Sequence, residues 1–240
     1  MVSPSVPLVL GSASPARLAT LQRAGVTAYV LVSDVDEDST VTQAVSQYGE
    51  LAPEDVALLL ARAKCEAVAE RLAGDTCPED APTGALVLGC DSVLELDGEL
   101  HGKPADEAEA ISRWHRMRGS SGVLHTAHWL IDDRDDSDGG TGATMGAVAS
   151  TIVHFAKVSD QEIAAYVASG EPLQVAGGFT IDGLGGPFIS GIEGDHHNVV
   201  GISLPLPARD AWRDQRELVR AALLINQDRG AAPTRRPSSP

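Results

Sequence analysis

Short apolar runs and helix-spaced apolar positions alternate along most of this chain. The apolar runs predict buried strands at residues 8–10, 30–33, 85–89, 123–131 and 146–155. A further pair of short strands, 93–96 and 99–100, flanks Asp97-Gly98, a dipeptide typical of two-residue hairpins. Apolar positions at helical spacing predict helices over the segments 15–24, 53–73, 106–118, 159–169 and 208–226. The glycine-rich residues 177–201 are expected to be irregular.

This alternation of strands and helices indicates an α/β fold, with parallel pairing between the strands that begin near Leu8 and Ala85. The acidic, glycine-rich insert at about 132–145 has the composition of a flexible loop. Residues 227–240, rich in Pro, Arg and Ser, are predicted to be a disordered tail. Ligands of such sheets bind beyond the carboxyl ends of the strands, so candidate site residues are expected there.

The segment that follows the first strand has the features of an anion site. Ser14 is a predicted N-cap, Pro15 takes the first helical position, and the helix N-terminus presents unpaired backbone N–H groups. Arg17 lies in the first turn, where a cation is unfavourable for the helix. An anion bound by both the amides and the arginine would resolve this conflict, and Ser12 and Ser14 would add donors. The segment therefore predicts phosphate binding.

Composition narrows the possible partners. The net charge of −16 argues against stable DNA, RNA or anionic-membrane binding, so a phosphate substrate needs a locally basic site. Only three lysines occur, and they are Lys64, Lys103 and Lys157. No apolar run reaches the length of a membrane span, no signal peptide is evident, and the three cysteines lack metal-ligand spacing. We expect a cytoplasmic protein.

Two carboxylates are candidates for chemistry on a bound phosphate. Asp91 follows a buried apolar strand, where a carboxylate must be hydrogen-bonded, metal-bound or protonated. Glu37 lies in the acidic run 34–38. Magnesium prefers carboxylates together with water and phosphate oxygens, so both residues are candidate ligands of Mg²⁺ or another divalent ion such as Mn²⁺. Lys64 lies at the edge of a predicted buried helix face, where it either extends to solvent or reaches into a cleft.

Several short motifs occur in the order seen in one protein family. They are Ser12-Ala-Ser-Pro-Ala-Arg17, Val35-Asp-Glu37, Leu60-Ala-Arg-Ala-Lys64, Gly89-Cys-Asp-Ser92, Gly102-Lys-Pro104, Glu171-Pro172, Ala176-Gly177, Gly194-Asp195 and Asn198-Val-Val-Gly201. In these motifs the chain resembles Maf proteins from about Leu8 to Pro205. The resemblance implies a single domain over residues 6–226, built as two lobes around a central cleft with a long twisted mixed sheet, as in inosine triphosphatases. It also implies a homodimer.

The same resemblance implies a nucleoside triphosphate pyrophosphatase. Such an enzyme hydrolyses the bond between the α- and β-phosphates of a nucleoside triphosphate, here a non-standard or pyrimidine one, and releases a nucleoside monophosphate and pyrophosphate. Asp91 would be the general base, with Glu37 as the second catalytic carboxylate. The phosphates would be held by the remaining motif residues: Ser12, Ser14, Arg17, Lys64 and Lys103.

The chain departs from the family pattern at positions that affect substrate contacts. Ala16 stands where many members have an arginine, so one phosphate contact is either missing or supplied by another residue such as Arg62. Ser92 and Asp182 are candidates for base recognition, but Asp182 replaces a common glutamine and accepts hydrogen bonds only. The base preference is therefore not transferable. The alternative function is a nucleotide-binding regulator of septum formation without turnover, which would not need both Asp91 and Glu37.

Overall fold

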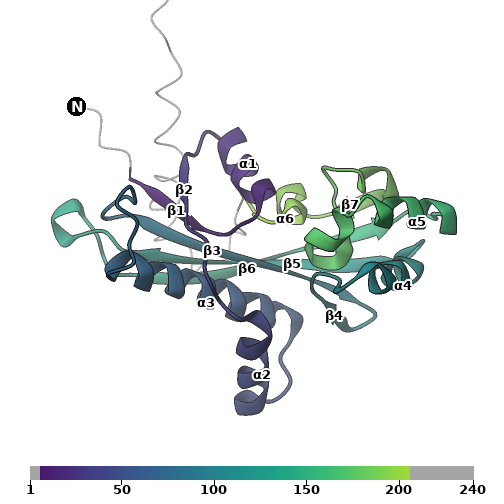
Figure 1. The fold of residues 1–240 in the computed structure, drawn as a ribbon, viewed down its shortest axis with the longest axis horizontal. Coiled ribbons are helices and arrows are strands. Elements are labelled where there is room, and N and C mark those ends of the chain that lie inside the picture. The colour runs from purple at the N-terminus through teal and green to yellow at the C-terminus, as the bar shows by residue number, and fades with distance from the viewer. Residues whose placement is uncertain (1–5, 206–240) are drawn as a thin grey trace, which may run out of the picture.

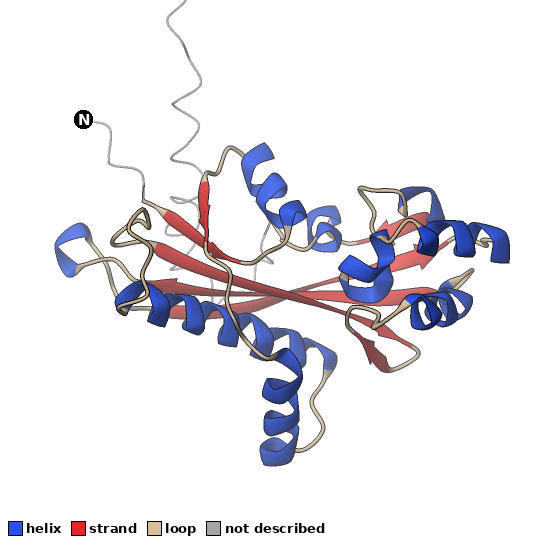
Figure 2. Cartoon of the chain, viewed as in Figure 1, coloured by secondary structure: helices blue, strands red, loops and turns tan. Residues whose placement is uncertain are grey.

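The computed structural model describes residues 6–205, so the predicted helix at 208–226 and the predicted tail lie outside the described residues. A mixed sheet of seven strands runs through this part of the chain (Figures 1 and 2). Its strands are β1 (Leu8–Gly11), β2 (Ala28–Val30), β3 (Leu86–Leu96), β4 (Glu99–His101), β5 (Ser121–Asp132), β6 (Thr144–Phe155) and β7 (Ile189–Glu193). The predicted α/β fold with a long, mixed sheet is confirmed.

The sheet has the order β2-β1-β3-β5-β6-β7, with β4 paired to β3. The strand β1 pairs in parallel with both β2 and β3, which confirms the parallel pairing predicted from the sequence. The remaining pairs are antiparallel, and β3, β5 and β6 are long enough to extend beyond β1. At its carboxyl end β1 stops at Gly11, opposite Gly89, so β3 continues without β1 as a neighbour. This step in the sheet is where the candidate site forms.

The described residues contain six α-helices, most of which lie against the sheet or its ends (Figure 1). They are α1 (Pro15–Arg23), α2 (Glu37–Tyr48), α3 (Pro53–Ala73), α4 (Glu107–Met117), α5 (Asp160–Ala168) and α6 (His196–Val200). In Figure 1, α3 lies along one face of the sheet, α1 and α6 lie on the other side, and α4 and α5 gather at the far end of the long strands. The helix α2 projects away from the body of the protein. None of the described helices is both long and apolar enough to span a membrane.

Local capping signals account for most helix starts. Ser14, Asp106 and Ser159 each accept a hydrogen bond from a backbone N–H of the first turn, as N-cap residues do. Ser159 and Glu162 form a complete capping box. These three predicted helix starts are confirmed.

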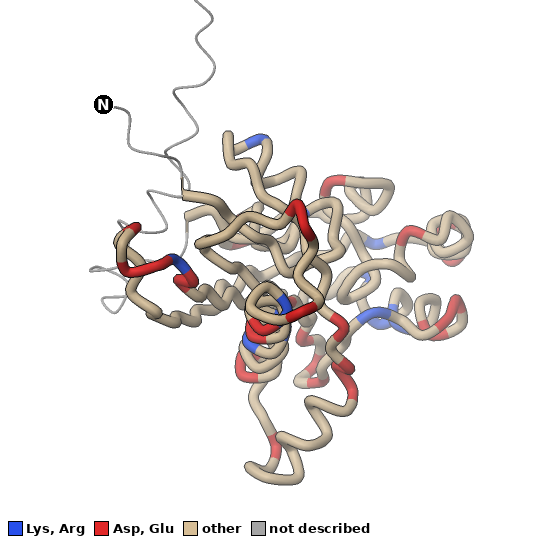
Figure 3. The backbone as a smooth tube through the Cα atoms, turned by 60° about the vertical axis from the view of Figure 1, so that its left-hand side comes forward, with Lys and Arg blue, Asp and Glu red and all other residues tan. Residues whose placement is uncertain are grey.

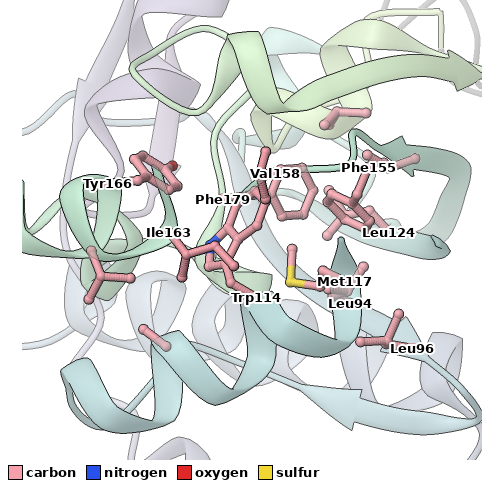
Figure 4. Packing of buried hydrophobic residues seen from close by; sticks show 14 residues of the cluster. Leu94, Leu96, Trp114, Met117, Leu124, Phe155, Val158, Ile163, Tyr166 and Phe179 are labelled. Atoms are coloured by element: carbon pink, nitrogen blue, oxygen red, sulfur yellow. The ribbon is translucent and has the colours of Figure 1, made fainter. Parts of the chain in front are cut away.

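The far end of the sheet has its own aromatic core (Figure 4). Trp114 of α4 is fully buried, and its indole N–H donates to the carbonyl of Gly178. The rings of Phe155, Tyr166 and Phe188 meet it edge-on at centroid distances of 5.9, 5.4 and 5.8 Å. Edge-to-face contacts of this kind add to the stabilisation from burial. This core fixes α4 and α5 to the sheet.

The structure differs from the sequence predictions in four places. Residues 85–89 and 93–96 belong to one continuous strand, β3, so Asp91 lies inside a strand and not at its end. The predicted strand at 30–33 occurs earlier, as β2. The helix α2 was not predicted, because only one of its residues, Ala44, is buried. The glycine-rich stretch 177–201 contains β7 and α6, although it was expected to be irregular.

Candidate active site

The turn between β1 and α1 is organised around two serines. The Ser14 side chain accepts a hydrogen bond from the backbone N–H of Arg17, and the N–H of Ser14 donates to Oγ of Ser12. Pro15 at the start of α1 needs no N–H partner. This turn therefore forms as the sequence predicts, and it places Ser12, 7% exposed, directly after the end of β1.

The Arg17 guanidinium is held by four acceptors. Its Nε donates to the Gly201 carbonyl at 2.7 Å, and Nη1 donates to Ser12 Oγ and to the Cys90 carbonyl, both at 2.9 Å. Nη2 donates to Ser92 Oγ at 3.1 Å. A guanidinium has five N–H donors, so four are used here and the fifth has no partner among the described residues. Arg17 thus ties α1, β3 and the turn after α6 together.

The Ser12 hydroxyl accepts two hydrogen bonds but donates none to another described residue. Its Oγ accepts from Arg17 and from the N–H of Ser14, and it donates to no other described residue. A hydroxyl has one donor and two acceptor sites, so both acceptor sites are filled. Ser12 therefore offers a single O–H donor beside the one free N–H of Arg17.

A second cluster joins Lys64 to two carboxylates. The Lys64 ammonium donates to Oδ1 of Asp91 and lies 2.8 Å from Oε1 of Glu37. The side chains of Lys64 and Asp91 are only 12% and 9% exposed, whereas Glu37 is 48% exposed. Lys64 comes from α3, Asp91 from β3, and Glu37 is the first residue of α2. Lys64 is thus directed inward. Its hydrogen bond to Asp91 meets the need of a buried carboxylate for a polar partner.

Burial controls the protonation of Asp91. Removal from water raises the pKa of the Asp91 carboxyl above its ordinary value, and the nearby Glu37 adds to this effect. Lys64 and Arg17 act in the opposite direction but do not cancel the burial. A carboxylate with a raised pKa is a stronger base than an exposed one, which suits it to accept a proton.

Glycine at position 89 lets α3 lie close to this part of the sheet. A Cβ added there would be 2.2 Å from the carbonyl oxygen of Ala61 and 2.7 Å from Cβ of Cys65, both in α3. The close approach brings Lys64, one helical turn from Ala61, onto Asp91 two residues along β3. The position of the ammonium therefore depends on the absence of a side chain at Gly89.

The other two predicted site residues are not drawn into either cluster by contacts with described residues. Lys103 and Asp182 are exposed, and neither forms a hydrogen bond or ion pair with another described residue. The Gly102 carbonyl before Lys103 accepts from Arg113 Nη1 at 2.6 Å and from the N–H of Gly177. The structure thus fixes the backbone next to Lys103 but does not bring it to the Lys64 cluster.

Asp182 is carried by a loop that Glu171 organises. The Glu171 carboxylate accepts hydrogen bonds from the Tyr166 hydroxyl, from Thr180 Oγ1 and from the backbone N–H groups of Leu184 and Gly185. Burial acts to raise the pKa of Glu171, but these hydrogen bonds outweigh it and lower the pKa. The Glu171 carboxylate is therefore an ionised centre around which residues 180–185 fold.

Arg62 does not join either cluster. Its Nε pairs with Glu66 at 2.8 Å, and its guanidinium lies 5.2 Å from the ring centre of Trp129. Its side chain is 55% exposed. In this arrangement Arg62 is occupied on the outer surface of α3, so it does not replace the arginine that is absent at position 16.

The charge distribution of the chain makes these two clusters distinctive. The sequence has 34 acidic and 18 basic residues, and in Figure 3 the acidic positions are spread over helices and loops while the basic ones are scattered. Lys64 and Arg17 nevertheless lie on either side of the same short stretch of β3. Because Asp91 and Glu37 offset the charge of Lys64, this point is close to neutral and repels an anion less than the net charge of −16 would suggest.

The carboxylates fit a magnesium ion that is shared with a substrate. No group of three or more acidic, histidine or cysteine side chains suited to a metal ion occurs among the described residues. However, Lys64 contacts only one oxygen of Asp91 and one of Glu37, so a second oxygen of each carboxylate remains. Magnesium is commonly held by one or two carboxylates plus phosphate oxygens and water. The residues present are therefore compatible with such an ion.

Two residues of this region were not identified from the sequence as parts of the site. Thr126 of β5 contacts both Ser92 and the carbonyl of Asn198, and Asn198 of α6 is completely buried. The motif that contains Asn198 was recognised, but no role followed from it. A polar residue inside the buried strand β5 was the available signal for Thr126.

Fold and site together define an α/β protein in which a buried lysine–dicarboxylate centre adjoins an arginine-held turn. The chain belongs to the Maf family: the model of the Maf-like protein matches residues 7–209. The resemblance seen in the sequence is therefore confirmed.

Known proteins of similar sequence carry one name. The chain is 55% identical over 210 residues to a nucleoside triphosphate pyrophosphatase of Salinispora tropica, covering 87% of this chain and 84% of the relative. It is 51% identical over 202 residues to the protein of that name from Streptomyces coelicolor, covering 84% of this chain and 87% of the relative.

A solved structure gives only a weak likeness. It is a nucleoside-triphosphatase, or dITP/XTP pyrophosphatase, from Mycobacterium abscessus. The match covers 91% of this chain and 99% of that one, at 14% identity and a TM-score of 0.33. This likeness is too low to bear on the site or the substrate.

Proposed function

We propose that the chain is a nucleoside triphosphate pyrophosphatase, a hydrolase that cleaves between the α- and β-phosphates and releases a nucleoside monophosphate and pyrophosphate. The observation that carries this proposal is the pairing of buried Asp91 and half-exposed Glu37 on Lys64, next to the Arg17–Ser12 turn. The names of the relatives at 55% and 51% identity support the same reaction. Substrates would be non-standard or pyrimidine nucleoside triphosphates.

In this proposal the residues divide the work between proton transfer and charge stabilisation. Asp91 takes the proton from the attacking water, because burial raises the pKa of its carboxyl. Ser12 O–H and the remaining N–H of Arg17 donate to phosphate oxygens, and Ser14 supports the turn that carries them. Preorganised donors of this kind stabilise charge that develops during phosphoryl transfer.

Lys64 has two roles in the proposal. In the free protein its charge offsets those of buried Asp91 and half-exposed Glu37, which allows the two carboxylates to lie close together. When a triphosphate binds, its ammonium is a further donor to the phosphates. Asp91 and Glu37 would hold a Mg²⁺ or Mn²⁺ ion, which neutralises phosphate charge and makes a bound water more acidic.

The exposed candidates complete the substrate contacts in this proposal. Lys103 would hold the far phosphates, while Asp182 and Ser92 would face the base. Since Ser92 already accepts from Arg17 and contacts Thr126, a base would meet at most a remaining lone pair there. We also expect a homodimer, as the family resemblance implies.

The first experiment measures pyrophosphate release with magnesium across a panel of standard, methylated and deaminated nucleoside triphosphates. Wild type is compared with Asp91→Asn and with Asp132→Asn, a control that alters another buried aspartate, one paired with Arg134. Release by the wild type and the control, with loss in Asp91→Asn, is the expected result. If Asp91→Asn still releases pyrophosphate at the wild-type rate, Asp91 is not the general base. Binding without release by the wild type would favour a nucleotide-binding regulator instead.

A further inference from the structure

A ring of hydrogen bonds connects the two edges of the Arg17 guanidinium. Nη2 of Arg17 reaches Ser92, Ser92 lies 2.9 Å from Thr126 Oγ1, and Thr126 reaches the carbonyl of Asn198 at 3.0 Å. The same carbonyl accepts the N–H of Gly201. The Gly201 carbonyl then accepts from Arg17 Nε at 2.7 Å, which closes the ring. Residues from α1, β3, β5 and the end of α6 are thereby linked.

The number of protons fixes the direction of the hydrogen bonds on one arm of this ring. Thr126 Oγ1 has a single proton and donates it to the Asn198 carbonyl, so it can only accept from Ser92. Ser92 therefore donates to Thr126 and accepts from Arg17. Along this arm the Nη2–H of Arg17, the Ser92 hydroxyl and the Thr126 hydroxyl all point toward the Asn198 carbonyl, and the Gly201 N–H donates to the same carbonyl from the other arm. Aligned hydrogen bonds of this kind polarise and strengthen one another in a buried setting.

The sheet and α6 keep the two middle members of the ring in register. Ser92 and Thr126 are directly opposite each other in the β3–β5 pair, and Thr126 is completely buried. Asn198 is held from its side chain as well, since its Nδ2 donates to the Leu124 carbonyl and to Thr151 Oγ1. The ring is thus anchored to buried residues of the sheet and α6, whereas the Ser12 proton and one N–H of Arg17 have no partner among the described residues.

We propose that Thr126 is a positioning residue for the phosphate site, because through Ser92 and the Asn198 carbonyl it holds both edges of the Arg17 guanidinium. This inference rests on the proposed function, since it assumes that Arg17 meets a phosphate. Loss of the Thr126 hydroxyl leaves Ser92 without its acceptor and removes one of the hydrogen bonds between α6 and β5. Arg17 then gains freedom, and its free N–H no longer has a fixed direction.

The test begins with a measurement that needs no turnover. The side-chain Nε–H signal of Arg17 is observed by NMR in nitrogen-15 labelled protein and assigned by its absence in Arg17→Lys. We expect a slowly exchanging signal in the wild type and in Thr126→Ser, which keeps the hydroxyl. We expect faster exchange of this proton in Thr126→Val and in Ser92→Ala. A matched control is Thr20→Val, which removes a buried hydroxyl bonded to the Ala16 carbonyl within α1.

The second measurement is kcat/KM for pyrophosphate release by the same variants. Thr126→Val and Ser92→Ala are each expected to lose about tenfold, because a fixed hydrogen bond to a charged group is disturbed. The double variant should lose no more kcat/KM than the less active of the two single variants, since both substitutions break the same ring. Thr126→Ser should recover most of the activity, and Thr20→Val should stay near wild type.

The outcomes separate the inference from the proposed function. If the Arg17 signal is unchanged in a folded Thr126→Val, the positioning role is refuted whatever the activity. Additive losses in the double variant would also refute it, since they would indicate two independent structural defects. If the wild type releases no pyrophosphate, the proposed function fails, and the NMR comparison alone decides whether Thr126 holds Arg17.

Discussion

Asp91 and Ser92 are consecutive residues of β3 that belong to opposite faces of the sheet. The Asp91 carboxylate is bound by Lys64 of α3, and the Ser92 hydroxyl is bound by Arg17 of α1. Side chains alternate between the two faces of a strand, so one short segment can serve two clusters. The proposed base and the hydroxyl that holds Arg17 of the proposed anion-holding turn are therefore adjacent along the chain, yet each has its own set of supporting elements.

Removal of Lys64 should destabilise the protein in a pH-dependent way. In Lys64→Met two carboxylates stay together without their cation, which costs about 3–5 kcal/mol when both are ionised. Loss of Lys64 also raises the pKa of Asp91 further, because Lys64 is the main group that lowers it. The folded variant then holds a proton that the unfolded chain releases, so its stability falls as pH rises.

Denaturant unfolding of Lys64→Met at pH 5 and pH 8 measures this difference. The matched control is Arg62→Met on the same helix, whose exposed pair with Glu66 contributes about 1 kcal/mol or less at either pH. An equal loss at both pH values in Lys64→Met would show that Lys64 does not neutralise Asp91.

A buried histidine should make the protein sensitive to acid. His128 is buried, its Nε2 accepts from the N–H of Ser203 at 2.9 Å, and burial together with the charge of Arg17 lowers its pKa to about 4. The unfolded chain takes up this proton near pH 6.5, before the folded protein does. Stability from neutral His128 is thus complete above pH 6.5 and is lost as pH falls toward 4, by about 3 kcal/mol.

The measurement is the free energy of unfolding between pH 7 and pH 4 in His128→Gln and wild type. We expect a shallower slope in the variant, because glutamine can accept from Ser203 without taking up a proton. His115→Gln, which changes a partly exposed histidine near Asp160, should keep the wild-type slope. Identical slopes in His128→Gln and wild type would contradict the assignment.

Neutralising Glu171 should loosen the loop that carries Asp182. In Glu171→Gln one of the two oxygen acceptors becomes an N–H donor, so either the Leu184 N–H or the Gly185 N–H loses its acceptor, which costs about 1–3 kcal/mol locally. Hydrogen exchange at these two amides should become faster while the core stays protected. Glu162→Gln serves as control, because glutamine replaces glutamate well in a capping box. Unchanged exchange at Leu184 and Gly185 would count against a hub role for Glu171.

A methyl group at position 89 should displace α3. The added Cβ would overlap the Ala61 carbonyl, a backbone atom that cannot move without the helix, so we expect a loss of about 3 kcal/mol or more in Gly89→Ala. Activity should also fall because Lys64 moves with the helix. Gly191→Ala in β7 is the control, since its Cβ would find only His154 at 3.7 Å. Stability close to wild type in Gly89→Ala would show that the helix has room to adjust.

The parts of the fold that sequence patterns predicted are those with local causes. Ser14, Asp106 and Ser159 cap the helices that they precede, because each cap needs only a neighbouring backbone N–H. The parallel pairing of β1 with β3 followed from the alternation of short apolar runs with helical segments. In each case the sequence pattern of the elements themselves was sufficient.

The parts that were missed depend on contacts between distant residues. Asp91 and Ser92 interrupt an apolar run, so they suggested a strand end, but β3 continues because Lys64 and Arg17 satisfy their polar groups. Lys64 is 27 positions from Asp91 and Arg17 is 75 positions from Ser92, so the sequence around β3 does not reveal these contacts. The helix α2 was hidden in the same manner, since Asp36 caps it but few apolar residues mark a buried face.

The placement of Glu37 gives the two carboxylates different mechanical stiffness. Asp91 sits in the middle of the sheet, while Glu37 opens α2, a projecting helix with a single buried residue, Ala44 (Figure 1). Segments with few buried contacts open at low free energy, independently of the core. Partial unwinding of α2 would withdraw Glu37 from Lys64 and leave Asp91 in place. The site thus combines Asp91, whose carboxylate is held in place by the sheet, with Glu37, whose carboxylate can leave and return as α2 unwinds and refolds.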